Sequence, residues 1–185
     1  MTEEINNLLK WLTWDLIQKY EVPEGAKMIP GTWDFKYKHF PDGSFQQFKA
    51  WFCIRWDIQK RLNDVPMNTY APVVQRSTVR LMLVLTFVMG LNNQSTNFSN
   101  TFAQADINQP MYLQPPAKYS DAFIRLIKIS YGQVESHRLW YEKLKEGLEK
   151  HIFTPSNVDP WMFISKTTIC VKYVDDCLWF YLKQK

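Results

Sequence analysis

Two adjacent aspartates, Asp175 and Asp176, are the residues in this sequence whose type and placement could do chemistry. They lie between two short apolar segments, Ile169–Val174 and Cys177–Leu182, that have the composition of β-strands. A hairpin of these strands would expose both carboxylates at its tip. Carboxylate oxygens are preferred ligands of Mg²⁺, and a pair of such ions can activate a hydroxyl group and stabilise a leaving pyrophosphate. An ordinary solvated turn would have the same sequence, so the aspartate pair alone is a weak signal.

The elements around this hairpin predict an α+β unit. A third strand is expected over Trp161–Ser165, after a helix that begins at Ser136 and ends near Lys150. Another helix is expected over Thr78–Met89, with Ser77 as its cap and Gly90 just past its end. This second helix is mostly apolar, so we expect it to be buried on several sides, whereas residues 92–100 are polar and weakly patterned. The helix after Ser136 carries apolar residues on one face: Leu139, Trp140, Leu144 and Leu148.

A hairpin is also predicted near the N-terminus, where Thr32–Lys38 alternates aromatic and polar residues. Pro41–Ser44 has turn chemistry, and Phe45–Arg55 resumes an extended pattern. The alternation places three aromatic residues on one face, which we interpret as core more readily than as a platform for stacking bases: Trp33, Phe35 and Tyr37. The basic residues of this region either line a nucleic-acid groove or form a solvated face: Lys36, Lys38, Lys49 and Arg55.

Composition sets wider bounds on the class of protein. The chain has 185 residues, 46% hydrophobic and 22% charged, which indicates one globular domain or a piece of a larger one. The net charge of +4 permits a polyanionic partner without requiring one. Three cysteines without framework spacing favour reduced thiols in an intracellular, cytoplasmic protein that is not secreted. The longest apolar stretch, Leu81–Gly90, is too short to span a bilayer, so no membrane partner is expected.

Ordered blocks along the chain carry a resemblance that the aspartate pair alone does not. The sequence resembles the reverse transcriptases of copia-type (Pseudoviridae-like) retrotransposons from about residue 13 to residue 182. The blocks that resemble this family follow in its order: Val22–Lys27, Ile29–Trp33, Phe35–Lys38, Pro41–Gly43, Phe48–Ala50, Tyr70–Val74, Ser77–Arg80, Phe98–Ala105, Met111–Leu113, Tyr131–Gly132, Arg138, Trp140–Leu144, Val158–Pro160 and Tyr173–Asp176.

The resemblance implies a partial polymerase in one domain over residues 1–185, fingers-like at about 13–75 and palm-like at about 76–182. It implies an antiparallel sheet backed by helices, with the thumb absent. The ancestral reaction would be RNA-directed DNA synthesis on a primer-template with deoxynucleoside triphosphates. Asp175 and Asp176 would be catalytic and would hold Mg²⁺. The candidates for binding nucleic acid or nucleotide are basic: Lys36, Lys49, Arg55 and Arg138.

Several departures from the family predict a degenerate, catalytically inactive fragment. The resemblance places a third catalytic aspartate at position 97, where this chain has Asn97. An asparagine offers one neutral carbonyl oxygen and an NH₂ group that cannot bind a cation, and Asp106 lies nine residues on, too far to substitute. Trp51 replaces a family arginine, and Glu135 replaces a glutamine that could contact the nucleotide. The chain also ends nine residues after Asp176.

Two alternatives remain open beside this interpretation. The fragment could persist as a non-enzymatic module that binds nucleic acid or another protein. It could also fold poorly, because palm surface that a thumb would cover would be exposed.

Overall fold

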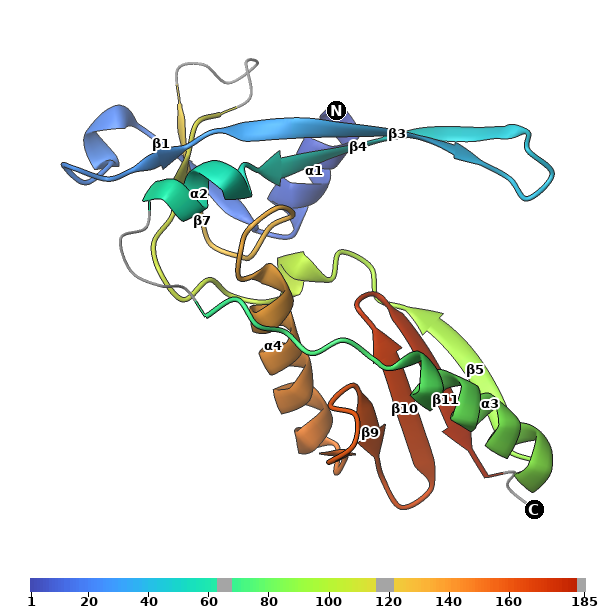
Figure 1. Cartoon of the computed structure of the whole chain (residues 1–185). Helices are drawn as coiled ribbons and strands as arrows, with labels where there is room; N and C mark the ends of the chain where they lie inside the picture. The colour runs from blue at the N-terminus through green and yellow to red at the C-terminus, as the bar shows by residue number, and fades with distance from the viewer. Residues whose placement is uncertain (63–67, 116–121, 183–185) are drawn as a thin grey trace. The chain divides into compact units, whose positions relative to one another are not determined.

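The computed structural model describes residues 1–62, 68–115 and 122–182, without the side chains of residues 60–62. The chain divides by its contacts into two units (Figure 1). The first unit is formed by Met1–Thr69 and Phe102–Leu139, and the second by Tyr70–Thr101 and Trp140–Lys185. Helices and antiparallel sheets occur in the same chain, which confirms the α+β class. The assignment of residues 13–75 to fingers and 76–182 to a palm stays a prediction.

The first unit is built on a four-stranded sheet of order β1-β7-β6-β2, in which only the β2–β6 pair is parallel. Its elements apart from the hairpin are α1 (Thr2–Lys10), β1 (Trp14–Ile17), η1 (Lys19–Glu21), β2 (Met28–Ile29), α2 (Trp56–Leu62), η2 (Phe102–Gln104), β6 (Tyr112–Leu113) and β7 (Phe123–Leu126). Apolar side chains from helix and sheet bury one another in a core, where hydrophobic burial supplies most of the stabilisation. The core consists of Ile5, Leu8, Trp14, Ile29, Phe52, Ile54, Leu113, Ile124 and Leu126.

The predicted N-terminal hairpin is confirmed as β3 (Gly31–His39) paired with β4 (Phe45–Ile54). Its interpretation as core is wrong for two of the three aromatic residues. Trp33 packs against the core, but Phe35 and Tyr37 are 61% and 64% exposed. The two strands form a separate two-stranded sheet (Figure 1), and no described element of the same unit covers the residues beyond Trp33.

The second unit contains a five-stranded antiparallel sheet of order β5-β11-β10-β9-β8. Its strands are β5 (Asn92–Asn97), β8 (Thr154–Pro155), β9 (Met162–Ile164), β10 (Thr168–Tyr173) and β11 (Asp176–Tyr181). The predicted hairpin of β10 and β11 and the strand β9 are confirmed to within two residues at each end. Strand β5 was not predicted, since its polar sequence lacks strand alternation and only its ladder with β11 identifies it.

Two helices cover opposite faces of this sheet. Neighbouring strand residues point to opposite faces, and Val171 packs with Met82 of α3 (Arg76–Met89). Lys172 faces the other way, toward Trp140 of α4 (Ser136–Lys150). The apolar face predicted for α4 is confirmed, because all four of its residues are buried: Leu139, Trp140, Leu144 and Leu148.

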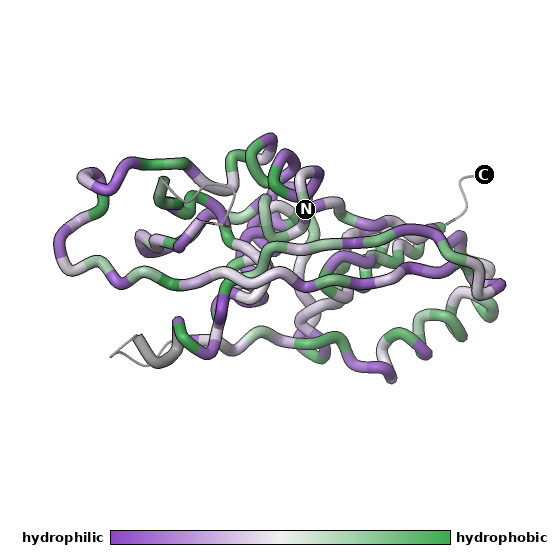
Figure 2. The backbone as a smooth tube through the Cα atoms, turned by 90° about the horizontal axis from the view of Figure 1, so that it is seen from above, coloured by the Kyte–Doolittle hydropathy of each residue, from purple (hydrophilic) through white to green (hydrophobic). Residues whose placement is uncertain are grey.

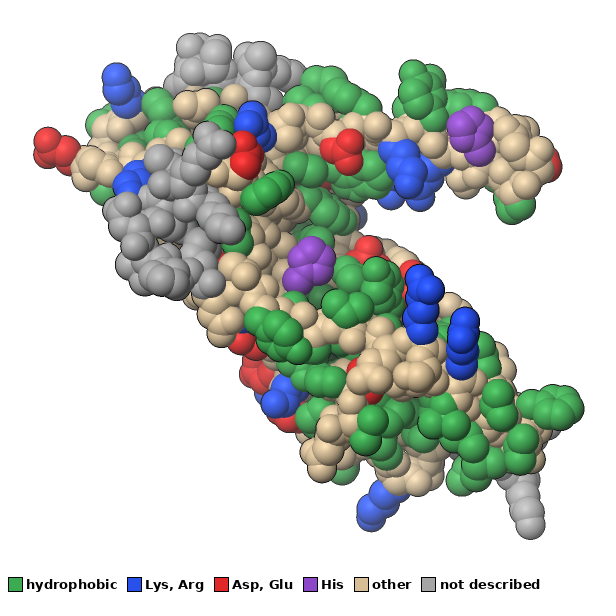
Figure 3. Space-filling view, in the orientation of Figure 1, with side chains coloured by type: hydrophobic (Ala, Val, Ile, Leu, Met, Phe, Trp, Pro, Cys, Tyr) green, Lys and Arg blue, Asp and Glu red, His purple; other side chains and the backbone are tan. Residues whose placement is uncertain are grey.

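The prediction that α3 is buried on several sides is wrong. Only Thr78 and Met82 of this helix are buried, although its sequence is hydrophobic over most of its length (Figure 2). A helix that packs on one face of a sheet buries a single stripe of its residues. The apolar residues on the other side of α3 gather at the α3 end of the second unit (Figure 3). They are 51% to 90% exposed: Leu81, Leu83, Val84, Phe87, Val88 and Met89. The cap residue is Gln75 and not Ser77, whereas Gly90 ends the helix as predicted, at φ 63°.

Within the described ranges, no helix has the length and hydrophobicity needed to cross a membrane.

Candidate active site

The loop that carries the aspartates is a two-residue connection between β10 and β11. Its first residue, Val174, has a φ of 50°. Tight hairpins require such a left-handed conformation, but a β-branched residue adopts it only under constraint. Two hydrogen bonds supply that constraint: the Trp140 indole Nε1–H donates to the Val174 carbonyl at 3.1 Å, and the Phe98 N–H donates to the Asp175 carbonyl at 2.9 Å. Helix α4 and the end of β5 therefore both fix the loop.

The three residues predicted for the catalytic centre lie together on this loop and the adjacent strand. Asn97, at the end of β5, pairs directly with Asp176 at the start of β11. The Asn97 Nδ2 group donates a hydrogen bond to Asp176 Oδ1 at 3.0 Å. Asp176 is exposed and Asp175 is half-buried, and Asp175 Oδ1 is a buried atom without a hydrogen-bond partner among the described residues. The side chain at position 97 thus faces Asp176, but it presents NH₂ to this carboxylate.

The donor set at this site consists of two carboxylates and one amide. Asp175 Oδ1 is a carboxylate oxygen that lacks a partner within the described residues, and Asp176 is open to solvent, so both could bind Mg²⁺. The Asn97 amide cannot add a second negative charge, and its NH₂ already occupies one oxygen of Asp176. Among the described residues, no group of three or more His, Cys, Asp or Glu side chains is placed to hold a metal ion.

A lysine that the sequence analysis did not single out lies beside the aspartate loop. Lys172, the next-to-last residue of β10, is 0% exposed. Its Nζ lies 3.4 Å from the centroid of the Phe98 ring and 5.0 Å from that of Trp140, and it has no hydrogen-bond partner in the described part of the chain. Burial lowers the pKa of Lys172 to about 8, against the opposing electrostatic effects of Cys177 and Cys170 and then of the two aspartates. The sequence feature that could have identified Lys172 is its position as the one charged side chain in an otherwise apolar strand.

Two thiols share the face of the sheet on which Lys172 lies. Cys170 and Cys177 are both buried, and their Sγ atoms are 3.0 Å apart. The hydrogen bond between them, together with burial, raises the pKa of the Cys170 thiol. Both cysteines are free, in keeping with the expectation of reduced thiols.

The basic candidates belong to the first unit, and two of them form a cross-strand pair. Lys36 of β3 lies directly opposite Lys49 of β4. Like charges placed opposite each other on a sheet destabilise it, unless an anion compensates them. Lys49 also lies over the ring of Trp51, 5.2 Å from its centroid, at the position where the resemblance placed an arginine.

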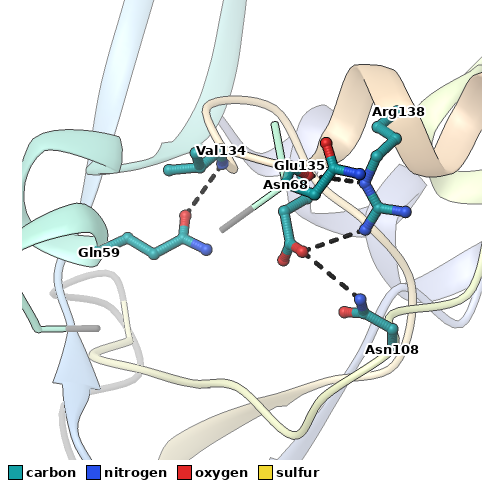
Figure 4. A network of polar contacts seen from close by, with 6 residues as sticks. All are labelled: Gln59, Asn68, Asn108, Val134, Glu135 and Arg138. Atoms are coloured by element: carbon teal, nitrogen blue, oxygen red, sulfur yellow. Dashed lines mark hydrogen bonds and ion pairs between the residues drawn. The ribbon is translucent and has the colours of Figure 1, made fainter. Parts of the chain in front are cut away.

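The other two basic candidates are engaged by acidic groups. The Arg55 guanidinium binds both carboxylate oxygens of Asp57, at 2.8 Å and 2.7 Å, and lowers the pKa of Asp57 to about 2. Arg138 bonds Glu135 at 3.2 Å, and its Nε–H donates to the backbone carbonyl of Asn68 at 2.7 Å (Figure 4). Both arginines therefore meet a carboxylate of their own chain, and Lys49 of the lysine pair likewise interacts with Glu4 of α1.

Figure 4 shows the polar network around Glu135, which is buried between these partners. Asn108 Nδ2 donates to Glu135 Oε1 at 3.4 Å, and the backbone N–H of Val134 donates to the Gln59 Oε1 atom at 3.0 Å. The negative charge of Glu135 is thus compensated by Arg138 of the same chain. Asp106, which was not expected to replace the missing aspartate, forms an ion pair with Lys128.

Comparisons with known proteins identify the family of the chain. The family model of reverse transcriptase (RNA-dependent DNA polymerase) matches residues 11–181. The chain is 34% identical over 96% of its length to the transposon Ty1-ER2 Gag-Pol polyprotein of Saccharomyces cerevisiae. It is 26% identical, again over 96% of its length, to the retrovirus-related Pol polyprotein from transposon TNT 1-94 of Nicotiana tabacum. It covers 10% and 14% of these two relatives. No solved structure matches the chain.

The chain therefore belongs to the reverse transcriptase family of copia-type retrotransposons, as the ordered blocks predicted.

Proposed function

We propose that the chain is the part of an RNA-directed DNA polymerase that presents the catalytic carboxylates, and that it has lost the polymerase reaction. The first unit would correspond to much of the fingers and the second unit to much of the palm. The reaction of its ancestor would be transfer of a deoxynucleotide to the 3′-hydroxyl of a primer on an RNA or DNA template. Asp175 and Asp176 would hold Mg²⁺, which supplies charge stabilisation for the transferred phosphate.

The observation that carries this proposal is the pairing of Asn97 with Asp176. A 3.0 Å hydrogen bond joins the residue 97 side chain to Asp176, which supports the proposal. An aspartate at position 97 would complete a set of three carboxylates, and the asparagine withdraws one full negative charge from it. A loss of about 4 kcal/mol in transition-state stabilisation would slow the reaction roughly a thousandfold. Inactivity is therefore proposed as a consequence of charge, not of a disordered loop.

Primer extension on an RNA template, with Mg²⁺ or Mn²⁺, tests the loss of activity. We expect no synthesis above the level of the Asp175→Ala variant. Robust extension by the unaltered chain, abolished by Asp175→Ala, would refute the proposal of inactivity.

Binding of Mn²⁺, measured from the electron paramagnetic resonance signal of the free ion, tests the metal site separately. Asn97→Asp should tighten binding on the order of tenfold, because it adds a negative charge beside the aspartate pair. Asn93→Asp is the matched control, since Asn93 is exposed on the same strand and the same face of the sheet. Equal effects of the two variants would show that position 97 has no special place at a metal site.

The β3–β4 hairpin is proposed as the surface that contacts the primer-template. One face carries the Lys36–Lys49 pair, and the other carries exposed aromatic rings, among them Tyr37 and Phe48 at 5.0 Å between centroids. Phosphates attract basic side chains through their charge, and exposed rings can stack on bases. This observation also favours the second candidate function, a non-enzymatic module that binds nucleic acid.

Binding to an RNA–DNA hybrid at several salt concentrations tests the hairpin. The double variant Lys36→Gln/Lys49→Gln should weaken binding and lower the slope of its salt dependence by about two counterions. Lys10→Gln is the control, because Lys10 is exposed at the end of α1 and its substitution removes one positive charge elsewhere in the same unit. Binding that does not depend on salt, or that the double variant retains in full, would refute this surface.

A chain with these partners would work inside the cell, and we propose the cytoplasm as its location.

A further inference from the structure

Two of the three cysteines meet inside the sheet of the second unit. Cys170 of β10 and Cys177 of β11 are 0% and 1% exposed, and their Sγ atoms lie 3.0 Å apart. They are diagonal neighbours in the ladder, since Cys170 pairs with Trp179 and Cys177 pairs with Lys172. Side chains at diagonal positions meet only where they lean toward each other. A disulfide bond is about 2 Å long, so a further approach of about 1 Å separates these two thiols from a covalent bond.

Cys53 provides an internal comparison for this pair. It lies half-buried on β4 of the first unit, whereas both other thiols belong to the second unit. If exposure governed oxidation, Cys53 would react first. If proximity governs it, the buried pair reacts, because a thiol held beside its partner acts at a very high effective concentration. The same proximity favours a disulfide over further oxidation of one sulfur to a sulfinic acid.

We propose that Cys170 and Cys177 are a modification site, at which hydrogen peroxide joins the two sulfurs in a reversible disulfide. The oxidant has to be small and uncharged, because both side chains are buried. The bond would link β10 to the residue that directly follows Asp176, so it would staple the hairpin that carries the aspartate pair. The inference rests on the two sulfurs and requires neither a metal site nor polymerase activity.

The reaction uses the two sulfurs in turn. One of them, as the thiolate, attacks a peroxide oxygen; the O–O bond breaks, hydroxide leaves and a sulfenic acid forms. The second sulfur then attacks the first, the S–O bond breaks, and the thiol proton leaves with the hydroxyl group as water. The two sulfurs together give two electrons to the peroxide. Dithiothreitol returns these electrons when it reduces the disulfide.

Tryptic digestion of the peroxide-treated full chain tests the proposal. Cleavage after Lys172 puts Cys170 in peptide 167–172 and Cys177 in peptide 173–183, so only a disulfide holds the two peptides together. Catalase removes the peroxide and iodoacetamide blocks the remaining thiols before digestion. We expect mass spectrometry of the monomeric fraction to find this linked pair of peptides, and dithiothreitol to separate them.

The variants give the matched controls. Cys170→Ser and Cys177→Ser should each abolish the linked pair, and Cys53→Ser should leave its yield unchanged. Sulfinic or sulfonic acid without the linked pair, or disulfides to Cys53 in its place, would overturn the proposal. The digest of the unaltered chain decides the question by itself if circular dichroism shows that a serine variant does not fold.

Amide hydrogen exchange in β10 and β11 tests the effect on the hairpin. A cross-link limits the freedom of the opened hairpin more than that of the closed one. We expect exchange in the oxidised chain to slow on the order of tenfold, and to return to its original rate with dithiothreitol. Equal rates in the reduced and the oxidised chain would show that the bond does not staple the hairpin.

Discussion

Replacing Lys172 by methionine should change how the stability of the chain depends on pH. The pKa of Lys172 falls from 10.5 to about 8 on folding, because the buried ammonium loses its hydration. Below pH 8 the amine is protonated in both the folded and the unfolded chain, and folding bears the full cost of burying the charge. Above pH 10.5 the amine is neutral in both states and this cost is gone. The free energy of unfolding should therefore rise as the pH rises from 8 to 10.5.

The size of the rise follows from the shift in pKa. A change of one pKa unit corresponds to about 1.4 kcal/mol, so the shift from 10.5 to about 8 corresponds to roughly 3 kcal/mol. Lys172→Met removes this contribution and leaves all other titrating groups in place. The difference in unfolding free energy between the two proteins should change by that amount across the window, whatever its value at pH 7.

Urea unfolding followed by tryptophan fluorescence, repeated from pH 7 to pH 11, measures the effect. Lys166→Met should give a curve parallel to that of the unaltered chain, since Lys166 is exposed. Selective ¹³Cε labelling of lysine gives a direct check, because one resonance should titrate near pH 8 and be absent from Lys172→Met. Parallel stability curves for the unaltered chain and Lys172→Met would show that no ammonium is buried at this position.

Three further predictions concern stability and thiol chemistry. Gly132→Ala should lower the free energy of unfolding in urea by about 3 kcal/mol, because the added Cβ would lie 2.3 Å from the Ile54 carbonyl oxygen and the residue has a φ of 76°. Gly25→Ala is the control, since Gly25 has a φ of 77° and open space around it. It should cost about 1 kcal/mol, which is the cost of the left-handed backbone alone. Asp159→Ala should destabilise by about 3 kcal/mol in the same assay, since this fully buried carboxylate accepts two backbone N–H bonds, and a loss under 1 kcal/mol would contradict that account. A thiol reagent at pH 8 should label at most Cys53, and only slowly, because burial raises the pKa of the Cys53 thiol to about 11. Fast labelling of all three cysteines before urea is added would contradict the burial of Cys170 and Cys177.

The parts of the fold that local pattern encodes could be predicted from the sequence. The apolar spacing of Leu139 to Leu148 predicted α4, and the segments on either side of the aspartates predicted their hairpin. In both cases the residues that define the element also supply its buried face. The position of Asn97 relative to the aspartate pair came from the family resemblance, and the ladder between β5 and β11 supplies the physical contact.

The features that could not be predicted depend on residues far apart in the sequence. Strand β5 forms because β11 offers hydrogen-bond partners, and nothing in its own polar sequence requires it. The burial of Lys172 depends on rings contributed by Phe98 and Trp140, which the chain brings from two other elements. The exposure of Phe35 on its hairpin and of Phe87 on α3 has the reverse cause, since no described element of the same unit covers them.

The place of β5 in its sheet has a consequence for the dynamics of the site. It is an edge strand, paired with β11 on one side only, and its last residue is Asn97. Edge strands with polar sequences open locally at a lower free-energy cost than the strands inside a sheet. Each such opening would release the amide from Asp176 and the Phe98 N–H from the loop together. Fraying of this one strand would therefore separate residue 97 and Phe98 from the aspartates, and amide hydrogen exchange at Phe98 would report the opening.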